Sequence, residues 1–221
     1  MTKHISFSGF GVLAVAAMTL YTASSCKKSS HGPSTPPGAT IIQSTINVQS
    51  IVAAGNNDDE VDPSRTGFID LYDGAAYTQS DAAAKSSDID FAYNYHGGGC
   101  NTCRFFENVQ SMSTRTDYVS SFSTITATQL TNAAYYYNIT EGQFDSIQSA
   151  ANIDTLFAKN NINNLGEFSD ITNRVNDVAI GKVFAFTDKN GKKGFFEIND
   201  YIANVPDGDP APMTLTVKIE K

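Results

Sequence analysis

The sequence contains no tryptophan, only three cysteines and three histidines, and one long apolar run, which lies near its N-terminus. Basic residues are also scarce: 15 lysines and arginines stand against 23 aspartates and glutamates, so the net charge is -8. Nucleic acids and anionic lipid surfaces bind concentrated basic surfaces, so this charge balance argues against both as partners. Without tryptophan, the 10 tyrosines and 14 phenylalanines must supply the large side chains of the core.

Catalytic motifs are missing as well. No serine stands in a nucleophile-elbow motif, no glycine-rich loop suits a phosphate, and the acidic residues are too scattered to nominate a glycosidase pair. We therefore expect a protein that is not an enzyme.

The single long apolar run, from Phe7 to Leu20, has the features of a secretion signal. Lys3 precedes it, and the small residues Ala23-Ser24-Ser25 follow it, directly before Cys26. A cysteine in this position resembles the lipobox of exported bacterial lipoproteins. We expect residues 1–25 to be a lipoprotein signal peptide, cut before Cys26, with lipid attached to that cysteine. A plain signal peptide cut nearby and a retained membrane helix are the alternatives, although serines and glycines in the region disfavour the helix.

A polar segment follows this cysteine. Residues 26–40 read CKKSSHGPSTPPGAT, and their serine, proline and glycine content suits an extended tether rather than a core. The remaining residues, 41–221, are enough for a single globular domain. Lys27 and Lys28 stand where an aspartate holds many lipoproteins at the inner membrane. We therefore expect the outer membrane, with the domain in the periplasm or on the cell surface.

Alternation of apolar and polar residues predicts strands near both ends of the domain. The predicted strands are residues 42–52, Gly67–Tyr72, Asp88–His96, Tyr135–Tyr137, Val183–Phe186, Phe195–Ile198 and Met213–Glu220. Within the third of them, Ile89, Phe91, Tyr93 and Tyr95 are expected on one face. The fifth and sixth flank the sequence Asp-Lys-Asn-Gly-Lys, which predicts a β-hairpin.

Short helices are predicted between these strands. The segment Thr78–Ser86 has Ser80 as a candidate N-cap. Thr140–Gln143 matches a capping box, and apolar residues recur after it at helical spacing as far as Phe157. The sequence therefore predicts an α+β fold, mainly antiparallel β, as a sheet or sandwich with short inserted helices and a C-terminal β-meander.

The most unusual motif is His96-Gly-Gly-Gly-Cys100-Asn-Thr-Cys103. If lipid occupies Cys26, then Cys100 and Cys103 are left as a pair in an oxidising compartment, and a structural disulfide is the favoured interpretation. Alternatively, the two thiolates and His96 supply three of the four ligands of tetrahedral zinc. Two free thiols are a further alternative. Covalent haem attachment is excluded, because Arg104 stands where that motif requires histidine.

The segment Ile89–Arg104 also resembles the strand-then-CxxC region of the thioredoxin family. This resemblance implies thiol redox chemistry with Cys100 as the nucleophile. The sequence departs from the family in lacking tryptophan, and no proline lies between Pro63 and Pro206 to face the cysteine pair.

An acidic segment, GNNDDEVDPS, could hold calcium through Asp58, Asp59, Glu60 and Asp62. Its spacing does not match the EF-hand loop, so a solvent-exposed charged turn is the favoured interpretation. We therefore predict no cofactor, with zinc or haem as the alternatives.

The order of lipobox, tether, a strand ending in DIDFAYNY and the hairpin GKVFAFTDKNGKKGFFEI resembles exported lipoproteins of unknown function. More distantly, it resembles haem-binding lipoproteins of the HmuY type. The latter resemblance implies haem bound through paired histidines. Residues 41–221 contain one histidine, His96, so no ligand residue can be carried over.

These features together predict a lipid-anchored protein of the cell envelope that acts as a non-enzymatic binding or interaction module. Its partner would be a protein, a glycan or a small molecule, in addition to the membrane that holds the lipid. A thiol-redox or metal-dependent site at the motif from His96 to Cys103 is the alternative function. A purely structural spacer at the envelope is a third.

Overall fold

The computed structural model describes residues 40–52, 61–96, 103–107, 132–135, 139–162, 178–203, 205–206 and 208–221, all of which belong to the unit His31–Lys221. The expected signal peptide, the expected lipidation site at Cys26 and nearly all of the expected tether lie outside these residues. Among the described helices, none is both long and apolar enough to cross a membrane.

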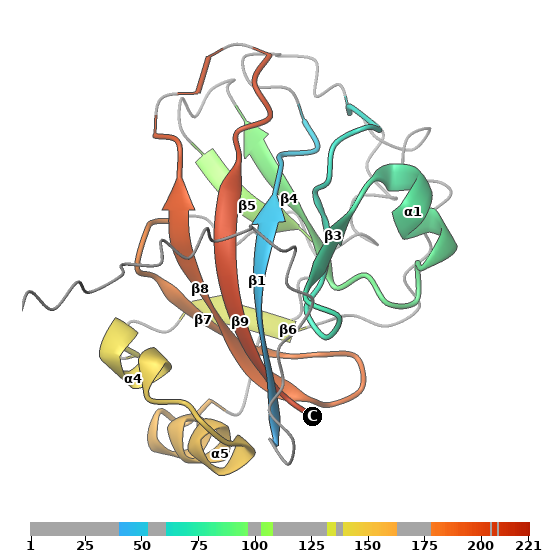
Figure 1. Cartoon of the computed structure of the whole chain (residues 1–221). Coiled ribbons are helices and arrows are strands. Elements are labelled where there is room, and N and C mark those ends of the chain that lie inside the picture. The colour runs from blue at the N-terminus through green and yellow to red at the C-terminus, as the bar shows by residue number, and fades with distance from the viewer. Residues whose placement is uncertain are drawn as a thin grey trace, which may run out of the picture. The chain divides into compact units, whose positions relative to one another are not determined.

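Five strands form one antiparallel sheet, in the order β1-β9-β8-β7-β6 (Figure 1). Their bounds are Ile41–Val48 for β1, Asn132–Tyr135 for β6, Val183–Thr187 for β7, Lys193–Tyr201 for β8 and Met213–Glu220 for β9. The pairs β7-β8 and β8-β9 are the C-terminal meander that the sequence predicts. The pairing of β1 with β9 joins the two ends of the domain, with Ile41 opposite Glu220.

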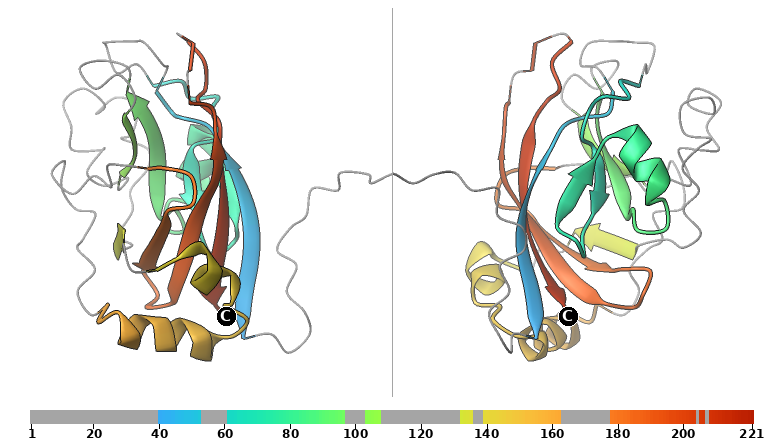
Figure 2. Two further views of the ribbon diagram at one scale, coloured as in Figure 1. Left: turned by 90° about the vertical axis from the view of Figure 1, so that its left-hand side faces the viewer. Right: turned by 45° about the vertical axis from the view of Figure 1, so that its right-hand side comes forward.

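Four strands form a second antiparallel sheet, in the order β3-β2-β4-β5. Their bounds are Phe68–Asp70 for β2, Ala75–Tyr77 for β3, Phe91–His96 for β4 and Cys103–Glu107 for β5. The two sheets lie as layers with a shared core between them (Figure 2). The fold is therefore mainly antiparallel β with short helices, as the sequence predicts, and of the two predicted arrangements it is the sandwich.

Aromatic side chains fill the space between the sheets. Phe91 and Phe106 come from the four-stranded sheet, Phe184 and Phe196 come from the five-stranded sheet, and all four are buried. The rings of Phe184 and Phe196 stack with centroids 4.9 Å apart, and Phe106 meets Phe196 edge-on at 5.4 Å. Such ring pairs contribute about 0.5–1.5 kcal/mol each beyond the area that they bury. Phenylalanine thus supplies the large core side chains that the absence of tryptophan required.

Two short helices, α4 (Glu141–Asp145) and α5 (Ala150–Lys159), pack on the outer side of the five-stranded sheet. Thr140 and Gln143 form the predicted capping box at the start of α4. A separate N-cap, Ser149, starts α5. The helical pattern that the sequence shows from Thr140 onward is therefore two helices, because the chain leaves the helical conformation between them.

A buried lysine holds the end of α4 against the sheet. The ammonium nitrogen of Lys218, on β9, donates to the backbone oxygens of Phe144, Asp145 and Ile147 at 2.9, 3.1 and 3.3 Å. The last carbonyls of a helix have no partner within the helix, so these bonds satisfy acceptors that would otherwise be buried without a donor. Burial lowers the pKa of Lys218.

The helix α1 (Gln79–Ala84) packs on the outer side of the four-stranded sheet. Its N-cap is Thr78 and not Ser80 as predicted, because the hydroxyl of Thr78 accepts from the backbone N–H of Asp81. The serine two residues later is already inside the helix. The sequence alone does not distinguish the two residues, because threonine and serine are both common N-caps.

The expected alternation before β4 is wrong at one residue. Ile89 packs with Ala82 and Ala92 on the side of α1, whereas Phe91 and Tyr93 point between the sheets. The strand begins only at Phe91, so the period of two that governs a strand does not reach back to Ile89.

Candidate functional site

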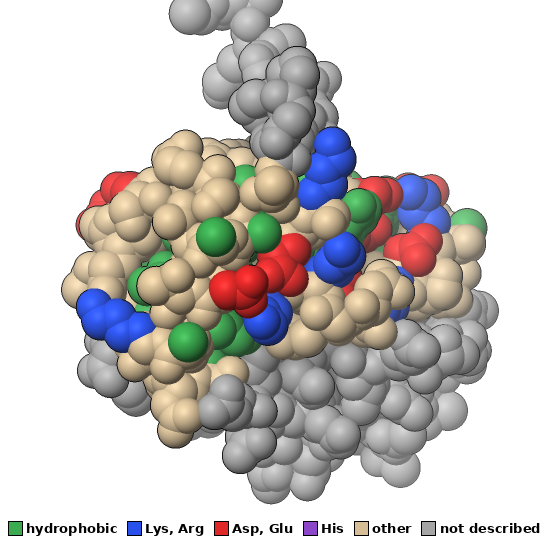
Figure 3. Space-filling view, turned by 90° about the horizontal axis from the view of Figure 1, so that it is seen from below, with side chains coloured by type: hydrophobic (Ala, Val, Ile, Leu, Met, Phe, Trp, Pro, Cys, Tyr) green, Lys and Arg blue, Asp and Glu red, His purple; other side chains and the backbone are tan. Residues whose placement is uncertain are grey.

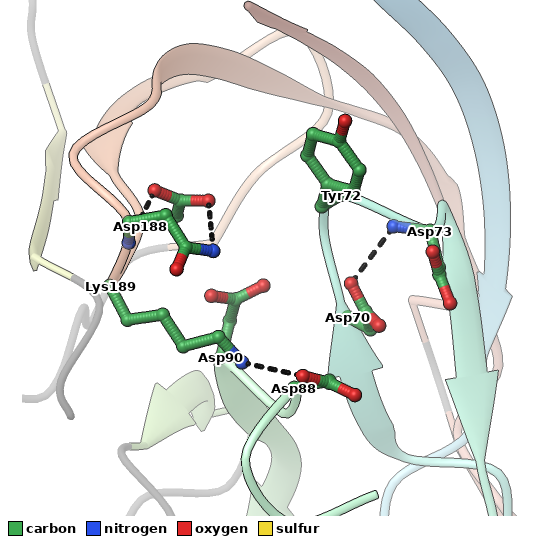
Figure 4. A pocket seen from close by; sticks show the side chains of 8 residues that line it. Asp70, Tyr72, Asp73, Asp88, Asp90, Asp188 and Lys189 are labelled. Carbon is green, nitrogen blue, oxygen red and sulfur yellow. Dashed lines mark hydrogen bonds and ion pairs between the residues drawn. The ribbon is translucent and has the colours of Figure 1, made fainter. Parts of the chain in front are cut away.

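A cavity of about 220 Å³ opens where turns from both sheets meet (Figure 4). Its walls come from β2 with the turn that follows it, from the residues before β4, and from the turn between β7 and β8. The lining residues are Asp70, Tyr72, Asp73, Asp88, Asp90, Asp188, Lys189 and Asn190. Five of them are aspartates and one is a lysine. We call this cavity the aspartate pocket.

Asp70 is the last residue of β2 and lines the pocket (Figure 4). Its Oδ1 accepts a hydrogen bond from the backbone N–H of Asp73 at 2.9 Å, which closes the turn toward β3. Gly74 completes this turn with a φ of +65°, and a Cβ there would lie 2.3 Å from the side chain of Ser44. Glycine is therefore required at this position for two reasons: the positive φ of its backbone and its close approach to β1.

Asp90 connects β2 to the start of β4. Its Oδ2 accepts from the backbone N–H of Leu71 at 2.7 Å, and its own N–H donates to the carbonyl of Ile69 at 2.8 Å. The residue is buried. Because a buried carboxylate with such donors resists movement, Asp90 fixes the position of one wall of the pocket relative to another.

Asp188 starts the hairpin turn between β7 and β8. Its Oδ1 accepts from the backbone N–H groups of Asn190 and Lys192, at 2.9 and 2.7 Å. Lys189 then reaches toward the other sheet, and its ammonium nitrogen lies 3.2 Å from Oδ1 of Asp88. This ion pair connects the two sheets beside the pocket, and the hydrogen bond from Lys189 holds the pKa of Asp88 below its usual value.

Burial decides the acidity of Asp70. The residue is only 3% exposed. Removal from water raises its pKa from 3.8 to about 6, and the negative charges of Asp73 and Asp88 act in the same direction. The amide of Asp73 and the ammonium of Lys189 oppose this increase. Among the described residues, Asp73 is the donor that reaches this carboxylate, and none reaches Oδ2.

The pocket has more negative than positive charge, because five carboxylates accompany one ammonium group. In the part of the chain that the structure describes, no group of three or more His, Cys, Asp or Glu residues is arranged to hold a metal ion. Asp90 and Asp188 are instead occupied with backbone amides. The Oδ2 atom of Asp70 is an acceptor for one further N–H donor, so the pocket suits an ammonium or guanidinium group better than a metal.

Sequence reasoning did not predict this pocket. Each of the three segments does carry a local signal, because aspartate followed closely by glycine, asparagine or another aspartate is typical of turns. These segments are Asp70–Gly74, Asp88–Asp90 and Asp188–Gly191. Which turns meet depends on how the two sheets pack, and no pattern within a single segment contains that information.

His96, the first residue of the predicted motif, is the last residue of β4, at the end of the strand opposite to Asp90. In the antiparallel pairing of β4 with β5, His96 stands directly opposite Cys103. Cys100 lies outside the described residues. The Cys100–Cys103 disulfide and the zinc site that includes His96 therefore stay predictions.

The acidic segment considered for calcium is described only at its end. Asp58, Asp59 and Glu60 lie outside the described residues. The carboxylate of Asp62 accepts from Ser64 and pairs with Arg65, whose Nε lies 3.0 Å from Oδ2. These hydrogen bonds lower the pKa of Asp62, and its carboxylate is already engaged by Ser64 and Arg65.

Comparisons of the chain with protein-family models, with curated proteins and with solved structures found no significant match. The function is therefore inferred from the geometry of the chain itself.

Proposed function

We propose that this protein is a lipid-anchored, non-enzymatic binding module of the cell envelope, and that the aspartate pocket binds a ligand through an ammonium or guanidinium group. The observation that carries the proposal is Asp70: a buried carboxylate that faces a cavity, has one oxygen without a described donor, and is surrounded by further carboxylates. A strongly perturbed carboxylate in a cleft is typical of functional sites.

The charge of the pocket favours a cation. Asp70 is mostly ionised at pH 7 because its pKa is about 6. Its burial makes that charge costly until a donor approaches. A charge-assisted hydrogen bond from a ligand contributes about 1.5–3 kcal/mol and removes this cost. Binding should therefore strengthen from pH 5 to pH 7, as Asp70 loses its proton.

The size of the pocket limits the ligand. Pockets for drug-sized molecules have volumes of about 300–1,000 Å³, whereas the aspartate pocket has a volume of about 220 Å³. It therefore suits a small amine, or a single lysine or arginine side chain that a protein partner inserts. Both present the same cationic nitrogen, and titration with free and with peptide-bound groups distinguishes them.

The test is a calorimetric titration of the domain with putrescine, N-acetyl-lysine amide and N-acetyl-arginine amide at low ionic strength. We expect one of these probes to bind and Asp70→Asn to weaken that binding at least fivefold. Asp154→Asn is the matched control, because it removes the same charge from an exposed position on α5. Equal binding by Asp70→Asn, binding by none of the probes, or tighter binding of Ca²⁺ than of every probe contradicts the proposal.

The lipid anchor has its own test in the full-length chain. The lipobox sequence before Cys26 and the polar tether after it support the anchor. Expression in a bacterium with an outer membrane, fed an alkyne-labelled fatty acid, should label the protein and place it in the outer-membrane fraction. Cys26→Ser should abolish the label, whereas Cys100→Ser should retain it. A label that survives Cys26→Ser refutes lipidation at this residue.

The register between β4 and β5 favours a second candidate function. Opposite residues on antiparallel strands are close neighbours, and here they are a histidine and a cysteine. We infer that thiol or zinc chemistry at His96, Cys100 and Cys103 is the alternative to the binding function. Thiol titration and zinc analysis of protein purified without chelator test it. Protein that contains no zinc, and no free thiol either before or after incubation with excess reduced glutathione, contradicts the alternative and agrees with the predicted structural disulfide.

A further inference from the structure

Two of the five aspartates in the aspartate pocket are bound to backbone amides of its walls. Oδ2 of Asp90 accepts from the backbone N–H of Leu71 at 2.7 Å. Oδ1 of Asp188 accepts from the backbone N–H groups of Asn190 and Lys192. Aspartates that bond to the backbone in this way stabilise turns. Asp90 and Asp188 therefore hold the walls in place, and a ligand that took over these bonds would have to open the turns.

Two further aspartates of the pocket are paired with lysines. Oδ1 of Asp88 lies 3.2 Å from the ammonium nitrogen of Lys189. Oδ2 of Asp73 lies 3.5 Å from the ammonium nitrogen of Lys85. The side chains of both aspartates are about half exposed, at 55% and 52%, so water solvates them and a ligand donor would gain little by replacing it. Acidic and basic side chains also lie beside one another over the described part of the face seen from below (Figure 3).

Asp70 differs from these four aspartates, because it is buried and one of its oxygens has no donor. Oδ1 accepts from the backbone N–H of Asp73 at 2.9 Å, whereas no described residue donates to Oδ2. Oε1 of Glu197 also lacks a partner, but that atom is enclosed. Oδ2 of Asp70 is not among the enclosed unpaired atoms, and its residue lines the cavity (Figure 4). A donor on a ligand can therefore reach Oδ2 from the cavity.

A single open oxygen restricts the kind of cation that binds. A guanidinium group binds a carboxylate best through two parallel N–H groups, one to each oxygen. Oδ1 of Asp70 is already engaged by the turn, so this paired arrangement is disfavoured. A primary ammonium group is a compact charge with three rotatable donors, and one of them is enough for Oδ2. A quaternary ammonium group has no N–H and would leave Oδ2 without a donor.

The other walls of the pocket suit an alkyl chain. Lys189 lies along the cavity with its ammonium group at Asp88, and its side chain is only 13% exposed (Figure 4). The pocket thus already accommodates one alkylammonium group that belongs to the protein. Tyr72 forms part of the wall and is 39% exposed. Aromatic rings and the methylene groups of long cationic side chains pack well together, while the charged end stays solvated or paired.

We propose that the ligand of the aspartate pocket carries a primary ammonium group on an unbranched alkyl chain, which donates to Oδ2 of Asp70 and packs its methylene groups against Tyr72. A free alkylamine and the lysine side chain of a polypeptide both have this chemistry. The inference rests on the proposed binding function and narrows its ligand, because it disfavours guanidinium and quaternary ammonium groups.

The test compares three probes that differ only in the cationic group: n-butylamine, N-butylguanidine and butyltrimethylammonium. Calorimetric titration of the protein at pH 7.5 and about 0.15 M salt measures each Kd, because distant charges are largely screened at this ionic strength. We expect butylamine to bind at least fivefold more tightly than butylguanidine and at least tenfold more tightly than the quaternary probe. N-acetyl-lysine amide distinguishes the two sources, since it adds peptide groups to the same butylammonium chain. Tighter binding than butylamine indicates a lysine side chain, and weaker binding indicates a free amine.

Variants separate the contact with Asp70 from general attraction by charge. Asp70→Asn should weaken butylamine and bring the Kd values of the three probes together. Asp154→Asn removes an exposed carboxylate from α5 and should preserve both the affinity and the preference. Tyr72→Leu should weaken butylamine at least twofold, whereas Tyr72→Phe should not, because the ring and not the hydroxyl packs against the chain.

The outcomes distinguish failure of this inference from failure of the proposed function. If none of the cationic probes binds, both are wrong. If butylguanidine or the quaternary probe binds as tightly as butylamine, the inference is overturned while the proposed function stands. A preference for butylamine that persists unchanged in Asp70→Asn also overturns the inference, because the selective contact would then lie elsewhere.

Discussion

The core between the sheets consists of apolar aromatic side chains, whereas the aspartate pocket at its border consists mainly of charged side chains. Phe106, Phe184 and Phe196 are buried together and stabilise the fold without any charge. In the pocket, Asp70 is almost as buried as these rings but carries a carboxylate whose pKa is raised to about 6. Burial contributes stability in the first region and costs it in the second. A costly buried charge beside a cavity is best explained by binding, because the core shows that this fold can fill buried space with phenylalanine.

The largest expected effect is in the core. Phe196→Ala should reduce the free energy of unfolding by about 3–5 kcal/mol, because it removes a ring that packs against four others and leaves a cavity. Urea denaturation monitored by tyrosine fluorescence measures the change. A loss below about 1 kcal/mol would mean that the core repacks freely. The core and the aspartate pocket would then not differ in how much burial contributes to stability.

The turn at Gly74, beside the aspartate pocket, should also be sensitive to substitution, here because its backbone is tightly constrained. Gly74→Ala combines a strained positive φ with a Cβ that would lie 2.3 Å from Ser44. We expect it to reduce the free energy of unfolding by about 1–3 kcal/mol. Gly181→Ala is the matched control, since it has a similar φ of +78° but no atom within 4 Å of its Cβ. Equal losses in the two variants would assign the whole effect to backbone strain.

Substitution of Asp70 should stabilise the protein at neutral pH, whereas substitution of a core phenylalanine should destabilise it. Its pKa is higher in the folded than in the unfolded protein, so the folded state binds the proton more tightly, and stability falls as pH rises from about 4 to about 6. Asp70→Asn removes this loss. We expect the variant to be about 1–3 kcal/mol more stable than the original chain at pH 7.5, with a smaller or no advantage at pH 4. Urea denaturation at both pH values checks this, and a variant that is less stable at pH 7.5 would contradict it.

The smallest stability effect is expected at the ion pair that connects the sheets. Lys189→Met should change the free energy of unfolding by less than about 1 kcal/mol, because Asp88 is largely exposed. The same substitution removes the positive charge from the pocket and should tighten the binding of a cationic probe about two- to fivefold at low salt. Calorimetric titration measures this. Weaker binding would show that Lys189 contacts the ligand instead of competing with it.

Local patterns in the sequence predicted the elements well. The C-terminal meander follows from alternation in residues 183–220 and from the Asn-Gly turn, and the capping box at Thr140 marks the start of α4. Each of these signals lies within about ten residues, so the chain reports them directly. The errors at Ser80 and Ile89 are also local, and each concerns the first residue of an element, where alternation and capping change over one or two positions.

Contacts between distant segments could not be predicted in the same way. The aspartate pocket combines Asp70, Asp90 and Asp188, and the pairing of β1 with β9 places Thr45 opposite Thr216. Nothing near Asp70 in the sequence indicates that a hairpin more than a hundred residues later will meet it. The sequence therefore indicates turns and polar strand faces, whereas the order of strands in the two sheets decides which of them become neighbours.

The pairing of Ile41 with Glu220 also has a consequence for synthesis and for the export that we propose. The first described strand, β1, pairs with β9, so the five-stranded sheet cannot close until residues 213–220 have left the ribosome. Sheets that depend on such distant pairing fold slowly. A chain that leaves the cytoplasm with its N-terminus first would thus stay unfolded during passage, and would complete its sheet only in the compartment where it is meant to work.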